Sequence, residues 1–264
     1  MAHKPYDNFV LSAKLDDLYT TKMDLNPFIT TDMSLTSHAG DKVIINKYTA
    51  TGNVEDLAMG EGNTQGIEVT YTPEEYVVKV TQGKFEFYDE QENKDPKIVD
   101  VGIKGVSAQM TNDMVAKIIN AYGKATLKAN YTKPNFEAFV DGVATLNMED
   151  NSGLFSFVNP KTSAEMKKAL KDDLKYIEEF VRTGYIGTVN GINVYTTKAM
   201  PDDKIYIATK EAVTNFVKKG AEVEYERDPD KRLNQYWLRK TQVIALTDAT
   251  KVVELSKGSS TPTE

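Results

Sequence analysis

Residues Leu154 to Pro201 read LFSFVNPKTSAEMKKALKDDLKYIEEFVRTGYIGTVNGINVYTTKAMP and decide the fold class, because a strand, a helix and a hairpin follow one another there. The apolar run Leu154 to Val158 ends at Asn159-Pro160, since proline has no amide hydrogen for a β-ladder. Thr162 and Glu165 have capping-box spacing, which predicts a helix start. Apolar residues then recur at three- and four-residue intervals: Met166, Leu170, Leu174, Ile177 and Val181. This spacing predicts a helix whose apolar face needs a sheet to cover.

The end of this stretch predicts a tight hairpin. Gly184 is typical of a helix C-terminus, where a left-handed residue is favoured. Asn190-Gly191 lies between two apolar runs and is the strongest short hairpin signal, because both turn positions need positive φ. Closing the turn pairs Val189 with Ile192 and Gly187 with Val194 on one face, and leaves Ile186, Thr188, Asn193 and Tyr195 on the other.

These residues resemble a known family. F-V-N-P, an amphipathic helix, G-Y-I-G-T-V-N-G-I-N-V-Y and a following M-P are similar to the C-terminal half of the major capsid proteins of tailed bacteriophages, whose Hong Kong phage capsid fold encapsulins share. The resemblance covers about Gly40 to Leu255. It implies an α+β subunit with an N-terminal arm, an extended β-hairpin loop, a peripheral domain with a long spine helix, and an axial domain.

Composition limits the other functions that this chain can have. The chain has 264 residues, a net charge of -7, no cysteine and two histidines, His3 and His38. It therefore has no disulfide framework, thiolate metal site or cysteine nucleophile. No apolar run approaches the roughly twenty residues that cross a bilayer, and no signal peptide is evident. Lys and Arg are scattered among Asp and Glu, whereas a sequence-reading nucleic-acid binder normally has a basic patch.

Residues 1–39 have no sustained periodicity. Phe9, Val10, Leu15, Leu18 and Tyr19 fit one side of a short helix, but Asn26-Pro27 and T-T-D-M-S-L-T-S are typical of an extended arm or loop. A frayed terminus is one interpretation. The family resemblance favours an N-terminal arm laid over neighbouring subunits.

A long excursion follows in residues 40–88. Val43 to Ile45 predict a strand, and Ala50 to Gly66 hold four glycines and few large apolar residues. Alternation resumes at Ile67, is broken at Thr72-Pro73, and returns through Phe87. We expect two strands with a flexible tip, and a loop of this length is uncommon unless it is functional. A phosphate-binding loop is excluded because the Gly-Lys-Ser/Thr sequence is missing.

The resemblance identifies this excursion as the loop that reaches across the next subunit of a capsomer; a disordered surface loop is the alternative. Some members of the family crosslink a lysine of this loop to an asparagine of another subunit. No lysine lies between Lys47 and Lys79, so noncovalent assembly is expected. The candidate inter-subunit contacts on the loop and the arm are Thr51, Asn53, Val54, Glu55, Leu57, Met59, Glu61, Tyr6 and Phe9.

A long helix is predicted over residues 95–122, with Asp95 as cap and Pro96 at its first position. One face is apolar from Val99 to Tyr122, while Gly102 and Gly105 are expected to distort the first turns. The resemblance makes this the spine helix. Further on, a short helix is predicted to end near Gly142, and Ile205 to Ala208 are predicted to form a strand. A second helix is predicted to begin at its cap Thr209 and to end at Gly220. Its buried face would carry Ala212, Val213, Phe216 and Val217. Strands follow at Val223 with Tyr225, Tyr236 to Leu246 and Val252 to Leu255, so the Arg227, Trp237 and Arg239 group is interpreted as part of a sheet rather than a nucleic-acid contact.

The expected organisation is an arm at 1–39, strands with the extended loop at 40–88 (tip 50–66), a peripheral domain at 89–135 plus 223–255, an axial domain at 136–222, and a disordered tail at 256–264. The resemblance implies a virion protein, assembled in the host cytoplasm, that forms hexamers and pentamers of an icosahedral shell around double-stranded DNA. The expected partners are further copies of the chain, a separate scaffolding protein, a portal protein and nearby packaged DNA, without membrane.

No enzyme motif appears, and the carboxylate pairs Asp172-Asp173 and Glu178-Glu179 point about a hundred degrees apart on a helix, so they cannot share a substrate. No enzyme, cofactor or metal is therefore expected. An encapsulin-like compartment is the alternative within the same fold. A monomeric binding module, or an enzyme without a recognisable motif, is the alternative from a different class.

Overall fold

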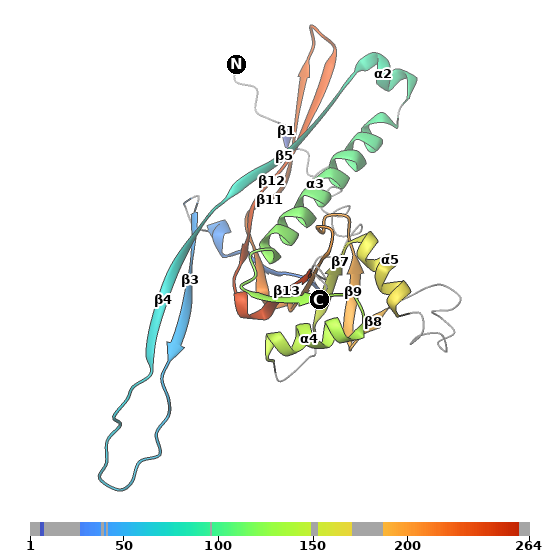
Figure 1. Ribbon diagram of the computed structural model, residues 1–264. Coiled ribbons are helices and arrows are strands. Elements are labelled where there is room, and N and C mark those ends of the chain that lie inside the picture. Colours follow the sequence, from blue (N-terminus) through green and yellow to red (C-terminus); the bar gives the residue numbers. More distant parts are fainter. Residues whose placement is uncertain are drawn as a thin grey trace.

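The computed structural model describes residues 6–7, 27–37, 40, 42–95, 97–148, 153–170 and 187–258. Two sheets, a long helix and a projecting two-stranded ribbon make up the molecule (Figure 1). The α+β class expected from the sequence is confirmed.

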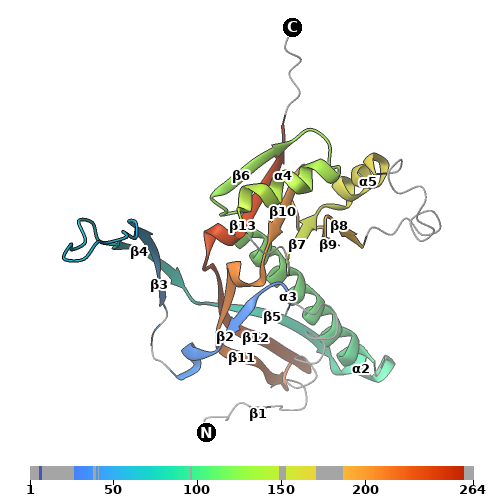
Figure 2. The same ribbon diagram turned by 90° about the horizontal axis from the view of Figure 1, so that it is seen from below.

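The first sheet has the order β1-β11-β12-β5, with β2 beside β11. Its centre is a long antiparallel hairpin of β11 (Val213–Asp228) and β12 (Leu233–Leu246), and β5 (Lys79–Tyr88) pairs with β12 along its length. Two short strands, β1 (Tyr6–Asp7) and β2 (Thr30–Asp32), pair with β11. Helix α2 (Asp89–Lys94) follows β5, and helix α3 (Ile98–Tyr122) returns across one face of this sheet (Figure 2).

The second sheet has the order β6-β13-β10-β7-β9-β8. Its strands are β6 (Leu127–Tyr131), β7 (Phe155–Val158), β8 (Thr188–Val189), β9 (Ile192–Thr196), β10 (Lys204–Ala208) and β13 (Val252–Lys257). Helices α4 (Phe136–Leu146) and α5 (Pro160–Ala169) belong to this part of the chain. Because both faces of the sheet are covered, all four residues of β7 are buried.

Two apolar cores meet at this second sheet. Phe155 and Phe157 point toward α3, where the buried Tyr122 donates a hydrogen bond to the carbonyl of Phe28. Val158 and Ile205 point the other way, into the core that contains α4 and α5. Successive residues of a strand face opposite sides, so one four-residue strand joins the two cores.

Several sequence predictions are confirmed. The Asn190-Gly191 turn has φ values of 51° and 75°, Val189 pairs with Ile192, and both side chains are buried. The strands predicted at 205–208, 236–246 and 252–255 are present within β10, β12 and β13.

The helix predicted from Thr209 to Gly220 is wrong. Only residues Lys210–Ala212 form a 3₁₀ turn, and strand β11 begins at Val213. A four-residue spacing such as that of Val213 and Val217 places side chains on one face of a strand as well as of a helix. These residues form a strand rather than a helix because they pair with β12. The pairing is irregular between Val217 and Glu222, where β-bulges include Gly220.

Two other helices have boundaries different from those predicted. Helix α5 begins at Pro160, because the Asn159 side chain accepts the Lys161 N–H at 3.0 Å, and Thr162 is therefore an internal, buried residue rather than the cap. Helix α4 continues past Gly142 to Leu146 and ends at the left-handed Asn147. The predictions for Leu174, Ile177, Val181, Gly184 and Ile186 fall outside the described residues.

The spine helix is also shifted. It begins at Ile98, and the Asp95 side chain accepts the Lys97 N–H at 3.0 Å just before it; the sequence analysis missed α2. Gly102 does not interrupt the helix. A Cβ there would lie 2.5 Å from the ring of Phe85, so the glycine allows α3 to pack closely on β5.

The sheets divide the chain at other residues than the sequence pattern suggested. Strands β6 and β13 pair within the second sheet, although 89–135 and 223–255 were grouped with the spine helix. Strand β11 begins at Val213, inside the predicted axial range. The predicted arm at 1–39 is only partly separate, because Phe28 and Ile29 are buried in the core around α3. Pairing between strands that are distant in the sequence sets these boundaries, and local sequence patterns do not indicate which distant strands pair.

Candidate functional site: the projecting ribbon

Many of the exposed large apolar side chains among the described residues lie on a ribbon formed by β3 (Lys42–Thr51) and β4 (Glu68–Val77). These strands pair with each other, and with no third strand of the described ranges, over ten residue pairs from Lys42 and Val77 to Thr51 and Glu68. Ten residues of strand span about 33 Å. The ribbon and its tip, residues 52–67, therefore extend well away from both sheets (Figure 1).

The predicted break at Thr72-Pro73 is wrong, since β4 continues through it and Pro73 pairs with Asn46. A two-stranded ribbon has two open edges, so a strand can accommodate a residue without an amide hydrogen there. Beyond the base, side chains on both faces of the ribbon are exposed to water.

Large apolar side chains are exposed along the ribbon. Val54 and Met59 at the tip are 89% and 106% exposed, and Tyr48 lies across from Tyr71 with ring centroids 6.2 Å apart. The other exposed apolar residues are Ile44, Leu57, Ile67, Val69 and Val77. An isolated two-stranded hairpin is marginally stable in water, and a contiguous exposed apolar patch marks an interaction surface. The ribbon therefore has the character of an unpartnered contact surface.

The tip has its own hydrogen bonds. The Glu55 carboxylate accepts the Thr64 N–H at 2.8 Å and the Thr64 hydroxyl at 2.5 Å, and these bonds lower the pKa of Glu55. A turn brings the Glu61 N–H to the Ala58 carbonyl at 3.1 Å. Gly52 has φ 138°, and a Cβ on it would lie 2.8 Å from the Gly66 carbonyl oxygen. Thus the tip is a shaped loop that carries acidic and apolar side chains.

The ribbon is anchored where it leaves the body. Tyr76 is buried against Val43 and Ala245, and its hydroxyl donates to the Leu246 carbonyl at 3.4 Å. Burial, followed by the neighbouring Glu74, raises the pKa of the Tyr76 phenol. Ion pairs join Lys47 to Glu74 and Lys42 to Glu75 across the strands. Buried packing fixes the direction of the ribbon at its base.

The predicted contact residues on the loop lie together at this tip, except Thr51, which is the last residue of β3. Thr51, Asn53, Val54, Leu57, Met59 and Glu61 are exposed, and Glu55 is half-buried. Tyr6 lies elsewhere: its backbone pairs with Tyr225 in β1, and Phe9 falls outside the described residues. Sequence analysis did not single out Tyr48, which is exposed on the ribbon opposite Tyr71 as the hairpin register requires.

The described part of the chain has no group of three His, Asp or Glu residues placed to hold a metal ion. Within the same ranges, no helix has both the length and the apolar character required to cross a membrane.

Comparisons with known proteins agree with this architecture. No protein-family model matches the sequence. The major capsid protein of Staphylococcus phage phiMR11 is 23% identical over 259 residues, which cover 95% of this chain and 93% of that protein. The capsid of cyanophage Pam1 has a TM-score of 0.67 at 10% identity, with 99% of this chain and 95% of the other covered.

The chain has the Hong Kong phage capsid fold. An encapsulin complex from Synechococcus elongatus has this capsid fold too, with a TM-score of 0.62 at 10% identity over 97% of this chain and 90% of that one. The resemblance to capsid proteins expected from the sequence is confirmed, and the encapsulin does not match better than the phage shells.

Proposed function

We propose that this chain is the major capsid protein of a tailed bacteriophage and that it self-assembles into hexamers and pentamers of an icosahedral shell around double-stranded DNA. The ribbon carries this proposal. Its paired strands are about 33 Å long and carry exposed apolar side chains. No other helix or strand of the described residues covers these side chains. The similarity to a phage major capsid protein over nearly the full length supports the same function.

Assembly through the ribbon is a head-to-tail contact, in which one surface of a subunit meets a different surface of the next. Such contacts close into rings when the rotation between neighbours closes. Each subunit is held by several neighbours at once, so weak individual contacts add to a stable shell. Thr51 and the tip residues Asn53, Val54, Glu55, Leu57, Met59 and Glu61 form the contact, with the arm residues Tyr6 and Phe9 as a second one.

In this proposal the first sheet with α3 is the peripheral domain, and the second sheet with α4 and α5 is the axial domain near the ring axis. Helix α3 packs on β5 and stiffens the subunit. A separate scaffolding protein, a portal protein and packaged DNA are further partners. Because no lysine lies between Lys47 and Lys79, the loop supplies no lysine for a covalent crosslink and assembly is noncovalent.

Deletion of residues 51–65 tests the role of the ribbon. The deleted residues belong neither to the two buried cores nor to the cluster of Val43, Tyr76 and Ala245 at the ribbon base, so we expect a folded subunit with an unchanged unfolding midpoint. We expect this subunit to form no shells, tubes or rings in electron micrographs. Normal particles from the deletion variant would rule out the gripping role. A matched control, Gly258→Ala near the end of β13, leaves the tip intact and should assemble.

Protein cargo distinguishes the encapsulin alternative. If particles purified from the natural source contain double-stranded DNA, the phage proposal holds. Particles that contain a specific protein cargo and no DNA would instead identify an encapsulin-like compartment, which the same fold permits.

A further inference from the structure

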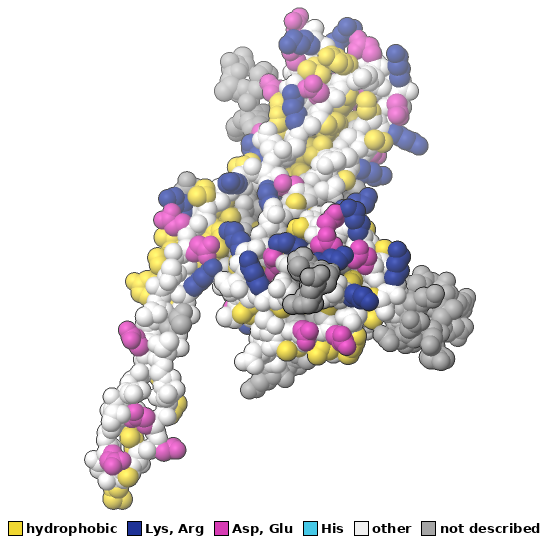
Figure 3. Space-filling model, viewed as in Figure 1, with side chains coloured by type: hydrophobic (Ala, Val, Ile, Leu, Met, Phe, Trp, Pro, Cys, Tyr) yellow, Lys and Arg dark blue, Asp and Glu magenta, His cyan; other side chains and the backbone are white. Residues whose placement is uncertain are grey.

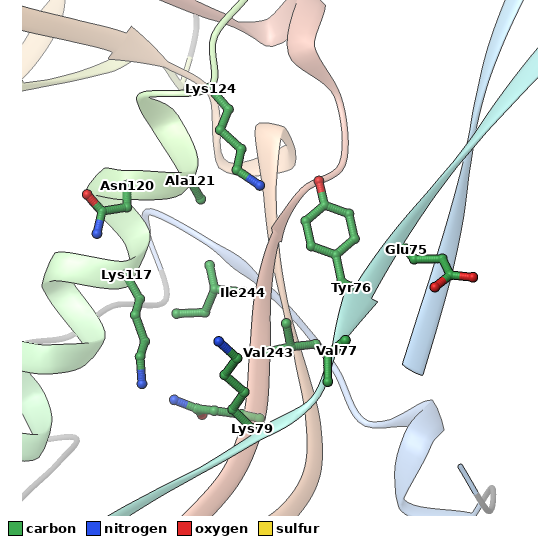
Figure 4. Close-up of a pocket in the computed structure, with 11 residues that line it drawn as sticks. Glu75, Tyr76, Val77, Lys79, Lys117, Asn120, Ala121, Lys124, Val243 and Ile244 are labelled. Carbon is green, nitrogen blue, oxygen red and sulfur yellow. The ribbon is translucent and has the colours of Figure 1, made fainter. Parts of the chain in front are cut away.

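A concave surface lies at the base of the ribbon, between β4, β5, β12 and the end of α3 (Figure 4). The cavity there is about 400 Å³. Its apolar wall includes Val77, Val243 and Ile244. Three lysines line it: Lys79 at the start of β5, Lys117 on α3 and Lys124 just after α3. We call this cavity the base pocket.

The base pocket has an excess of positive charge. Lys117 is paired with Asp113 at 2.5 Å, and Glu75 is paired with Lys42 at 3.0 Å. Lys124 lies 5.0 Å from the centre of the Tyr76 ring. Among the described residues, Lys79 and Lys124 have no carboxylate within salt-bridge distance, and Lys124 interacts with Glu74 only at longer range. Such a pocket fits an apolar segment that carries carboxylates.

The ribbon tip has this complementary chemistry. Residues 48–78 contain no Lys or Arg, while the tip holds Glu55, Asp56 and Glu61 beside the exposed Val54, Leu57 and Met59. Figure 3 shows acidic and apolar side chains, and no basic ones, on the far part of the ribbon. The hydrogen bonds from Thr64 lower the pKa of the Glu55 carboxyl.

The tip of a subunit cannot reach its own base pocket. Both lie on the same ribbon, separated by ten paired residues or about 33 Å of strand. The pairing keeps the ribbon extended, so only the tip of another copy can enter the pocket. A contact between a tip and a base pocket is head-to-tail, and each copy in a ring both donates and accepts once.

We propose that the base pocket binds the ribbon tip of a second copy of this chain, with Lys79 and Lys124 facing the carboxylates of Asp56 and Glu61. This inference rests on the proposed assembly function and names the receiving surface for it. Lys79 and Lys124 act here as specificity residues for the neighbouring subunit.

Cysteine crosslinking tests the contact directly, because the chain has no cysteine of its own. A double variant, Asp56→Cys with Lys79→Cys, is oxidised after assembly and run on a non-reducing gel. Each chain then has one thiol at the tip and one at the pocket, so we expect a ladder that extends beyond the dimer. A variant with a single cysteine can form dimers at most. The control Asp56→Cys with Lys128→Cys has its second thiol on an exposed residue of β6 and should give no ladder.

Charge reversal provides an independent measurement. Lys79→Glu with Lys124→Glu should raise the protein concentration needed for assembly at least tenfold. Lys104→Glu with Lys128→Glu changes the charge equally at exposed lysines outside the pocket, and should leave that concentration within about twofold. Circular dichroism confirms that both variants are folded.

The outcomes separate the inference from the function on which it rests. If the unchanged protein assembles but the Asp56 and Lys79 thiols give no ladder, or the pocket reversal is as harmless as its control, the pocket has a different occupant and the inference is wrong. If the unchanged protein does not assemble at all, both the proposed function and the inference fail.

Discussion

Gly102 and Gly105 lie three residues apart on α3, and they differ in the space that is available for a Cβ atom. A Cβ on Gly102 would lie 2.5 Å from the Phe85 ring, whereas a Cβ on Gly105 would meet nothing within 4 Å. The first glycine is required by packing between helix and sheet. The second only weakens the helix through backbone entropy.

We therefore expect opposite effects from the same substitution. Gly105→Ala should raise the free energy of unfolding by about 0.5–1 kcal/mol, because alanine has the higher helix propensity. Gly102→Ala should lower it by about 1–3 kcal/mol, because the Phe85 ring must move to admit a methyl group. Guanidinium unfolding of unassembled subunits measures both. Equal effects at the two positions would mean that α3 does not approach β5 this closely.

Two buried tyrosines predict how stability responds to high pH. Burial, with Asp203 as a second cause, raises the pKa of Tyr131 to about 12, and burial, with Glu254 as a second cause, raises the pKa of Tyr206 to about 12. The unfolded chain loses these protons near pH 10, before the folded chain does. The stability from the neutral phenols is therefore complete below about pH 10 and falls as the pH rises toward 12.

The double variant Tyr131→Phe with Tyr206→Phe should show a shallower decline between pH 10 and 12 than the unchanged protein. Unfolding midpoints measured at half-unit pH intervals provide the comparison. Identical slopes would show that other groups control alkaline unfolding.

At the scale of secondary-structure elements, two asparagines cap helices in different environments. Asn135 caps α4 at a partly exposed site, where its side chain accepts the Ala138 N–H at 3.2 Å. Asn159 caps α5 and, being buried, also donates from its amide to the Met200 carbonyl at 2.7 Å. Asn159 therefore links α5 to the segment that follows β9.

Asn135→Ala should cost about 1 kcal/mol of stability, the ordinary value of a cap. Asn159→Ala should cost at least 1 kcal/mol more, because it also leaves the buried Met200 carbonyl without its donor. Asn159→Asp keeps the cap and removes the donor, so its cost should lie above that of Asn135→Ala. Thermal unfolding of the three variants tests this order, and equal costs would contradict it.

Element types were predictable where a local signal determined them. Asn190-Gly191 specified its hairpin because positive φ at two successive positions leaves few other turns. The Val213 and Val217 spacing did not specify a helix, because a four-residue interval suits both periods and only the distant β12 resolves it. Asn159-Pro160 contained a cap signal as good as that of Thr162, and in the structure the Asn159 side chain caps the helix with Pro160 at its first position.

At the scale of the whole molecule, the chain is divided between a body with two buried cores and a ribbon with an exposed apolar surface. The sequence indicated where the ribbon turns, because four glycines lie between Ala50 and Gly66. That its residues contact a neighbouring subunit stays a prediction. The sequence did not predict the base pocket. Lys79, Lys117 and Lys124 are spread over 46 residues and meet only because α3 returns along β5.

The oligomeric state of the purified, unchanged protein tests the central claim most directly. Sedimentation velocity over a wide concentration range, with electron microscopy of the same samples, should show shells, tubes or rings that become more abundant as concentration increases. A single monomer species at the highest concentration, with no particles in the micrographs, would contradict the account of this chain as a self-assembling capsid protein.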